Sequence, residues 1–174
     1  MISRLDHINV FVLDQDRAKT FYTETLGFEL RNDAVLDGFR WLTVGPKDQK
    51  DLNILLAYPA PPMFSPEDAE AVRALVAKGS LGGGVFETAD CQKTFEELSA
   101  KGVTFLQEPA ERPYGIEALF RDDSGNSFSL TQPKWLGCHR GSDGRGSRPG
   151  VVLDRPRAAA DRQPRGRSAR VARL

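Results

Sequence analysis

The stretch RLDHINVFVLDQDRAKTFYTETLGFEL, residues 4–30, decides the fold of this chain. Residues 5–12 are rich in β-branched side chains and alternate in polarity, which indicates a strand. Apolar side chains then recur at helical spacing, which indicates a helix. Asp14 or Asp16 can cap its start by accepting backbone N–H bonds. Gly27 stands where a left-handed residue commonly ends a helix, and strand character resumes after it. The stretch therefore predicts a β-α-β unit.

A weaker copy of this plan returns at residues 83–105, where a helix capped by Asp90 closes at Gly102. Each copy is accompanied by further strand patterns that turn signals separate. We expect these strands at residues 39–44, 52–58, 103–106, 116–121 and 127–131. Because an internal repeat constrains the fold more than any single element, the sequence predicts an α+β protein built from two βαβββ modules.

The modules are expected to cover residues 1–61 and 80–133 and to form one domain over residues 1–133. A linker helix is predicted at residues 65–79, since it opens with Ser as a cap and Pro at the first helical position. From residue 134 to residue 174, Arg, Gly, Pro and Ala dominate and apolar periodicity ends. Such a segment buries too little surface to offset its ordering entropy, so we expect a disordered tail.

The formal net charge of zero hides two segments of opposite sign. Residues 1–133 carry a net charge of −8, and residues 134–174 carry +8. An acidic body argues against nucleic acid as the main partner, while the basic tail leaves weak attraction to a polyanion as an alternative. The two cysteines do not form a disulfide framework, and no apolar run suggests a signal peptide or membrane span. We therefore expect a cytoplasmic protein without membrane association.

Three segments carry a family resemblance: DHINVFVLDQDRAKTFYTETLGFEL at 6–30, GGGVFETADCQKTFEELSAKGVTF at 82–105 and RDDSGNSFSLTQ at 121–132. They resemble the two modules and the closing hairpin of the vicinal oxygen chelate superfamily. This group includes glyoxalase I, bleomycin-resistance proteins and extradiol dioxygenases. The resemblance implies mixed sheets that curl around a cavity for a small molecule, and a homodimer. It is less specific for activity, because the superfamily hosts many chemistries.

The resemblance also implies where a metal would bind. In metal-dependent members, one ligand comes from each of the first, fourth, fifth and eighth strands, which here fall on His7, Leu55 or Leu56, Gly83 or Gly84, and Ser129. A catalytic divalent metal needs about three or four protein ligands, and His7 alone does not meet this. The other histidine, His139, lies in the tail. We therefore expect no cofactor, and leave open a divalent metal in a rearranged site that uses His7 and Glu117.

The candidate ligand-binding residues are His7, Phe39, Trp41, Arg112, Tyr114, Glu117 and Ser129, and none is assigned a catalytic role. His7 is either a hydrogen-bonding or acid–base group of a site, or a satisfied polar residue on a half-buried strand. Phe39 and Trp41 alternate on one strand, which suits either an aromatic ligand in a cavity or core packing.

Arg112 and Tyr114 are expected in a loop at the rim of a sheet, where they would hold an anionic ligand or form an ordinary turn. Glu117 is either a cavity carboxylate with a raised pKa or a solvated residue paired with Arg121 or a neighbour. Cys91 begins a helix but lacks a visible partnering base, which argues against a nucleophile.

Three functions follow from these observations. The first is a cavity protein that binds a small organic molecule without a metal, to sequester it or to transform it by acid–base chemistry. The second is a metal-dependent lyase, isomerase or dioxygenase that uses His7 and Glu117. The third is attachment to a polyanion through the basic tail. Whether the protein is an enzyme stays open at this point.

Overall fold

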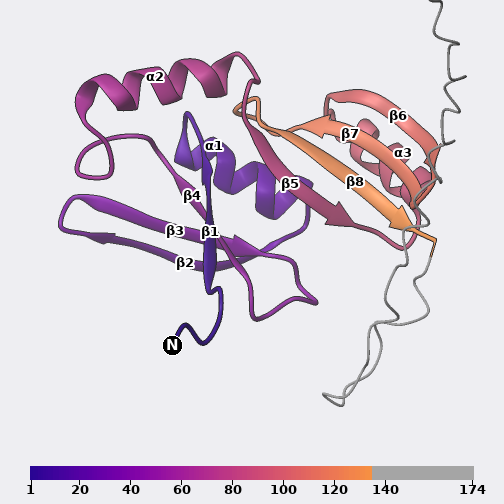
Figure 1. The fold of residues 1–174 in the computed structure, drawn as a ribbon, viewed down its shortest axis with the longest axis horizontal. Helices are drawn as coiled ribbons and strands as arrows, with labels where there is room; N and C mark the ends of the chain where they lie inside the picture. Colours follow the sequence, from indigo (N-terminus) through magenta and orange to yellow (C-terminus); the bar gives the residue numbers. More distant parts are fainter. Residues whose placement is uncertain (135–174) are drawn as a thin grey trace, which may run out of the picture. The chain divides into compact units, whose positions relative to one another are not determined.

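The computed structural model describes residues 1–134 (Figure 1). The predictions for the tail beyond Lys134 lie outside these residues and stay predictions. The first module contains β1 (His7–Phe11), α1 (Gln15–Thr20), the π-helical turn η1 (Phe21–Thr25), β2 (Glu29–Leu36), β3 (Phe39–Gly45) and β4 (Asn53–Ala57). Helix α2 (Pro66–Ala77) leads to the second module, which contains β5 (Gly82–Glu87), α3 (Cys91–Ala100), β6 (Phe105–Arg112), β7 (Gly115–Arg121) and β8 (Ser127–Pro133).

Each module forms one four-stranded mixed sheet. Sheet A has the strand order β1-β4-β3-β2, and sheet B has the order β5-β8-β7-β6. In each sheet the first strand pairs in parallel with the last strand of its module, and the other pairs are antiparallel. The prediction of two βαβββ modules is confirmed, and the repeat extends to the pairing of every strand.

The caps that hold the helices are those expected from the sequence. Asp14 accepts backbone N–H bonds at the start of α1, Ser65 does so for α2, and Asp90 does so for α3. Gly27 and Gly102 adopt positive φ values of 76° and 85° just after their helices, a conformation that glycine reaches without steric cost.

The strand β6 differs from its prediction. It runs from Phe105 to Arg112, so the expected loop at Arg112 is a turn in which only Pro113 and Tyr114 lie between β6 and β7. Pro109 obscures this strand in the sequence, but β6 is an edge strand, where the missing N–H of proline is tolerated. The placement of Arg112 in a loop was therefore wrong, and its side chain takes its direction from the sheet.

One hydrophobic core joins the two modules. Val10 and Val12, on one face of the first strand segment, are 3% and 0% exposed. The Tyr22 ring lies edge-on to the Phe128 ring of the second module, with 6.4 Å between centroids. Burying one large apolar side chain stabilises a fold by about 1.5–3 kcal/mol. The predicted polarity of β1 is confirmed, because His7 belongs to the opposite, partly open face.

Asp122 lies at the junction of the modules and is 7% exposed. Its Oδ1 accepts hydrogen bonds from the backbone N–H groups of Ser124, Gly125 and Asn126 at 2.8–3.0 Å. Its Oδ2 accepts from the Tyr22 hydroxyl at 3.0 Å and from Asn126 Nδ2 at 2.8 Å. A buried carboxylate is tolerated only when its oxygens are satisfied in this way. The same residue thus shapes the β7–β8 turn and binds it to η1.

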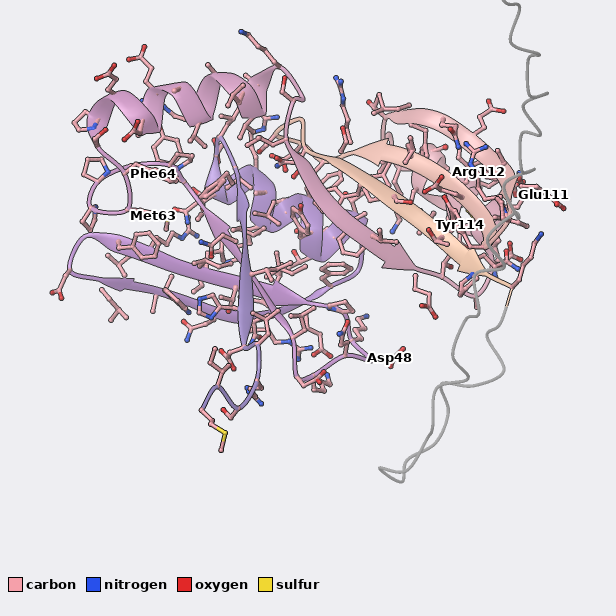
Figure 2. The ribbon with its side chains drawn as sticks, in the orientation of Figure 1. Asp48, Met63, Phe64, Glu111, Arg112 and Tyr114 are labelled. Atoms are coloured by element: carbon pink, nitrogen blue, oxygen red, sulfur yellow. The ribbon has the colours of Figure 1, made fainter. Side chains whose placement is uncertain are left out.

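Replacing Asp122 with Ala should destabilise the protein by about 3–5 kcal/mol, because several buried donors lose their acceptor at once. Urea unfolding of the two proteins measures this difference. Asp48→Ala, which removes a carboxylate from an exposed loop (labelled in Figure 2), is the matched control and should change stability by less than about 0.5 kcal/mol. Equal stability of the two variants would contradict the role given to Asp122.

The neighbouring Asp123 should make stability depend on pH. Burial, followed by the charge of Asp122, raises its pKa from 3.8 to about 6. Because the folded protein holds the Asp123 proton more tightly than the unfolded chain does, this carboxyl group stabilises the folded protein at low pH. That contribution is complete below about pH 4 and is lost as pH rises through about 6. Asp123→Asn should therefore raise the free energy of unfolding at about pH 8 by about 1–2 kcal/mol and have little effect at about pH 4. Thermal unfolding at both pH values, with Asp48→Asn as control, tests this; a gain at the acidic pH alone would contradict it.

Candidate functional site

The face of sheet A that points away from the core carries a group of aromatic rings. The His7 imidazole meets the Trp41 indole edge-on, with 5.1 Å between ring centroids, and Phe39 packs on the same indole at 6.1 Å. Farther along this face, Phe64 from the segment before α2 packs against Phe11 at 5.4 Å (Figure 2). Rings that are half-buried and stand together on an open face suit a flat, apolar ligand.

A pocket of about 210 Å³ opens beside His7 on this face. Its lining includes Asp6, Arg31, Trp41 and Asn53. His7 Nδ1 lies 3.5 Å from the Asp6 carboxylate, at the limit of a hydrogen bond, and has no other polar partner within residues 1–134. The structure thus brings together His7 and Trp41, as predicted, and adds a small polar pocket next to them.

The corresponding face of sheet B carries a polar network around Glu117. One oxygen of its carboxylate accepts a short hydrogen bond from the Ser129 hydroxyl. The other accepts from the Tyr114 hydroxyl at 3.0 Å and from Arg112 Nε at 3.3 Å. Arg112 also donates to the Gln107 side chain at 2.7 Å. The four residues predicted on the second module therefore form one connected group, in which each side chain is held by another.

The network sets the charge of Glu117. The hydrogen bond from Ser129, aided by Tyr114 and Arg112, lowers the pKa of Glu117 although burial acts in the opposite direction. Of the two alternatives for Glu117, the raised pKa is wrong, and the carboxylate is paired, with Arg112 and not Arg121 as its cation. The same contact with Glu117 raises the pKa of Tyr114. The group therefore presents an ionised carboxylate, a neutral phenol and a guanidinium, a set suited to hydrogen bonding with a ligand.

Comparison with known proteins assigns the family. Residues 4–130 match the family described as Glyoxalase/Bleomycin resistance protein/Dioxygenase superfamily. The chain belongs to this superfamily. It is 38% identical over 125 residues to the uncharacterized protein YurT of Bacillus subtilis. The aligned region covers 71% of this chain and 94% of that protein.

Two solved structures are also similar to this chain. The crystal structure of UcmS2 shares 52% sequence identity and a TM-score of 0.72, covering 75% of this chain and 98% of that one. TnmS3, an antibiotic binding protein from Streptomyces sp. CB03234, shares 35% identity and a TM-score of 0.61, covering 76% and 97%.

The strand positions that carry metal ligands in metal-dependent members of the superfamily hold different chemistry here. Leu55 is 2% exposed and apolar, and lies beside Asn9 in the register of β1 and β4. A Cβ atom added to Gly83 would lie 1.9 Å from the Phe128 ring, so this position has no room for a ligating side chain. The Ser129 hydroxyl is already bonded to Glu117. These positions do not fit the ligand set of a metal-dependent member.

The rearranged metal site that combines His7 with Glu117 gains no support from these contacts. His7 stands on sheet A and Glu117 on sheet B, and their hydrogen-bond and ring contacts connect each to its own sheet. Within the described residues, no group of three or more His, Cys, Asp or Glu side chains is placed to hold a metal ion. The rearranged site stays a prediction. Cys91 is buried, and burial raises its thiol pKa, which disfavours a nucleophilic role.

Sequence reasoning missed Arg31 and Gln107. A β-bulge between Leu30 and Asn32 interrupts the two-residue alternation of β2 and brings Arg31 into the pocket beside His7. Gln107 lies in the part of β6 that was expected to be loop. A bulge has no reliable signature in a single sequence, whereas the long β6 could have been found from the alternation on either side of Pro109.

Gly83→Ala should destabilise the protein by about 3 kcal/mol, because the added methyl group overlaps the Phe128 ring, which is 2% exposed and enclosed by other aromatics. Gly82→Ala is the control, since its Cβ would meet nothing closer than the Ser127 carbonyl at 3.9 Å. Chemical unfolding of both variants measures the difference. If Gly83→Ala were as stable as the control, this position could accept a side chain and the fit argument against a metal ligand here would fail.

Proposed function

We propose that this protein binds a small aromatic organic molecule on the open faces of its sheets and sequesters it, without the metal centre of the catalytic members. The observation that carries this proposal is the group of His7, Trp41 and Phe39 on sheet A. A flat ligand that covers these half-buried rings removes further apolar surface from water and adds ring contacts. Both effects stabilise the bound ligand.

The similar structures support this proposal. TnmS3, which is 35% identical to this chain, is an antibiotic binding protein, and the ring group on sheet A is the feature of this chain suited to the same kind of binding. In the Glu117 network the carboxylate has a lowered pKa and accepts hydrogen bonds from Ser129, Tyr114 and Arg112, which disfavours it as a general base. Binding therefore accounts for the site better than acid–base catalysis does.

We further propose that two copies of the chain assemble into a homodimer that encloses the ligand. Both open faces end in large apolar side chains that meet water in a single chain: Leu36 on sheet A is 63% exposed, and Val85 on sheet B is 70% exposed. Exposed apolar patches on one face commonly mark an interaction surface. The aromatic group and the polar network lie on different sheets, so a second copy that joins the two kinds of face would enclose a ligand more completely.

No helix among the described residues is long and apolar enough to cross a membrane. The expected cytoplasmic location accordingly remains a proposal based on the sequence.

Binding of 2-naphthol, followed by isothermal titration calorimetry, tests the proposed function. Trp41→Ala should weaken binding by about tenfold or more, as expected for the loss of a central aromatic contact. Tyr58→Ala is the matched control, because Tyr58 is an aromatic residue that is 39% exposed and whose ring contacts Arg73. Prior dialysis against a chelator should leave the affinity unchanged. Equal affinity of Trp41→Ala and the unmodified protein would refute the site, and binding that requires added metal would favour the metal-dependent alternative.

A further inference from the structure

The pocket beside His7 contains an arginine in an unusual position. The bulge in β2 lays the Arg31 side chain over Gly45, where an added Cβ atom would lie 3.1 Å from Arg31 Nε. The guanidinium is held in place at its outer end: Nη1 donates to Glu29 at 2.6 Å, and Nη2 donates to the Pro46 carbonyl at 2.9 Å. The side chain is thus fixed before any ligand arrives, and Gly45 provides the space for it.

Two polar atoms at this pocket lack a partner. Arg31 Nε is buried and forms no hydrogen bond with any of residues 1–134, and the same is true of His7 Nδ1 apart from its weak contact with Asp6. Both residues line the pocket. A buried donor without an acceptor costs about 1–3 kcal/mol, and the guanidinium N–H cannot be relieved by deprotonation. The two residues therefore bring unpaired polar atoms to the wall of the pocket, and a small side-chain shift would let an incoming acceptor pair with Arg31 Nε.

The charges around the pocket favour an acceptor that is itself charged. Glu29 is shared by Arg31 and Lys50, and Asp6 pairs with Arg4, whose hydrogen bond lowers the Asp6 pKa. Glu29 and Asp6 are therefore both paired, and Lys50 shares the charge of Glu29 with Arg31. A carboxylate that enters between Arg31 and His7 would gain charge-assisted hydrogen bonds, which are stronger than neutral ones.

We infer that the pocket binds the carboxylate of an acidic aromatic molecule, whose ring lies against Trp41. Trp41 belongs both to the pocket and to the aromatic group, so one ligand can reach both with its two ends. This inference rests on the proposed function and narrows its ligand class. Arg31 would then determine specificity: the ring contacts provide general affinity for aromatic molecules, and the guanidinium selects those that carry a carboxylate next to the ring.

Calorimetric titration with 2-naphthoate and with its uncharged amide, 2-naphthamide, tests the inference. The two probes share one ring system and differ in charge. The unmodified protein should bind 2-naphthoate about tenfold more tightly than the amide, and Arg31→Gln should remove this preference while the affinity for the amide stays the same. Lys78→Gln is the control, because it removes one positive charge from an exposed side chain at the end of α2, outside the pocket, and should keep the preference.

The outcomes separate the inference from the function on which it rests. Equal affinity of the unmodified protein for the two probes would mean that water satisfies the pocket, and it would overturn the inference even if Arg31→Gln failed to fold. A preference for 2-naphthoate that persists in a folded Arg31→Gln variant would also overturn it. If both probes bound equally and both lost affinity in Trp41→Ala, the proposed function would stand and only the carboxylate pocket would fail.

Discussion

The rest of the structure depends on the buried carboxylate of Asp122. It gathers the backbone donors of the β7–β8 turn and also holds the Tyr22 hydroxyl, whose pKa is raised by burial and by that carboxylate, so the phenol stays a donor. The turn then reaches the first strand, since Asn126 Nδ2 donates to the Phe11 carbonyl and Ser124 Oγ accepts from the Leu13 N–H. Through these contacts one residue links both modules and orients β1, the strand that carries His7.

Because of this arrangement, the two faces of each sheet have different roles. Core faces hold the modules together, so the residues on them are chosen for packing, and at Gly83 this packing leaves no room for a ligating side chain. The Phe128 ring fills the space beside Gly83, whereas Leu55 is a buried apolar residue on the same sheet face as Asn9. The open faces are free of that demand. They carry rings on one sheet and a satisfied polar network on the other, an arrangement that is organised before a ligand binds and so lowers the cost of binding.

Much of the fold was predictable because it rests on local periodicity. Residue spacing in the sequence predicts the repeat and the helix caps. It also predicts that His7 and Glu117 point outward. What could not be predicted depends on distant partners or on broken periodicity. The Tyr22–Asp122 bond spans 100 residues, the pKa of Glu117 depends on a serine 12 residues away on another strand, and Arg31 enters its pocket through a bulge. Propensity carries no information on such contacts, and they shape the site more than the fold.

Native mass spectrometry of the purified protein, after incubation with Mn²⁺, Fe²⁺, Ni²⁺ or Zn²⁺ and then with 2-naphthoate, tests the central claim most directly. One spectrum reports the number of chains, the metal content and the bound ligand. The account predicts a dimer that gains the mass of 2-naphthoate and carries no metal in fixed proportion to the chain. A species that holds one metal ion per chain, and gains 2-naphthoate only when that ion is present, would contradict it.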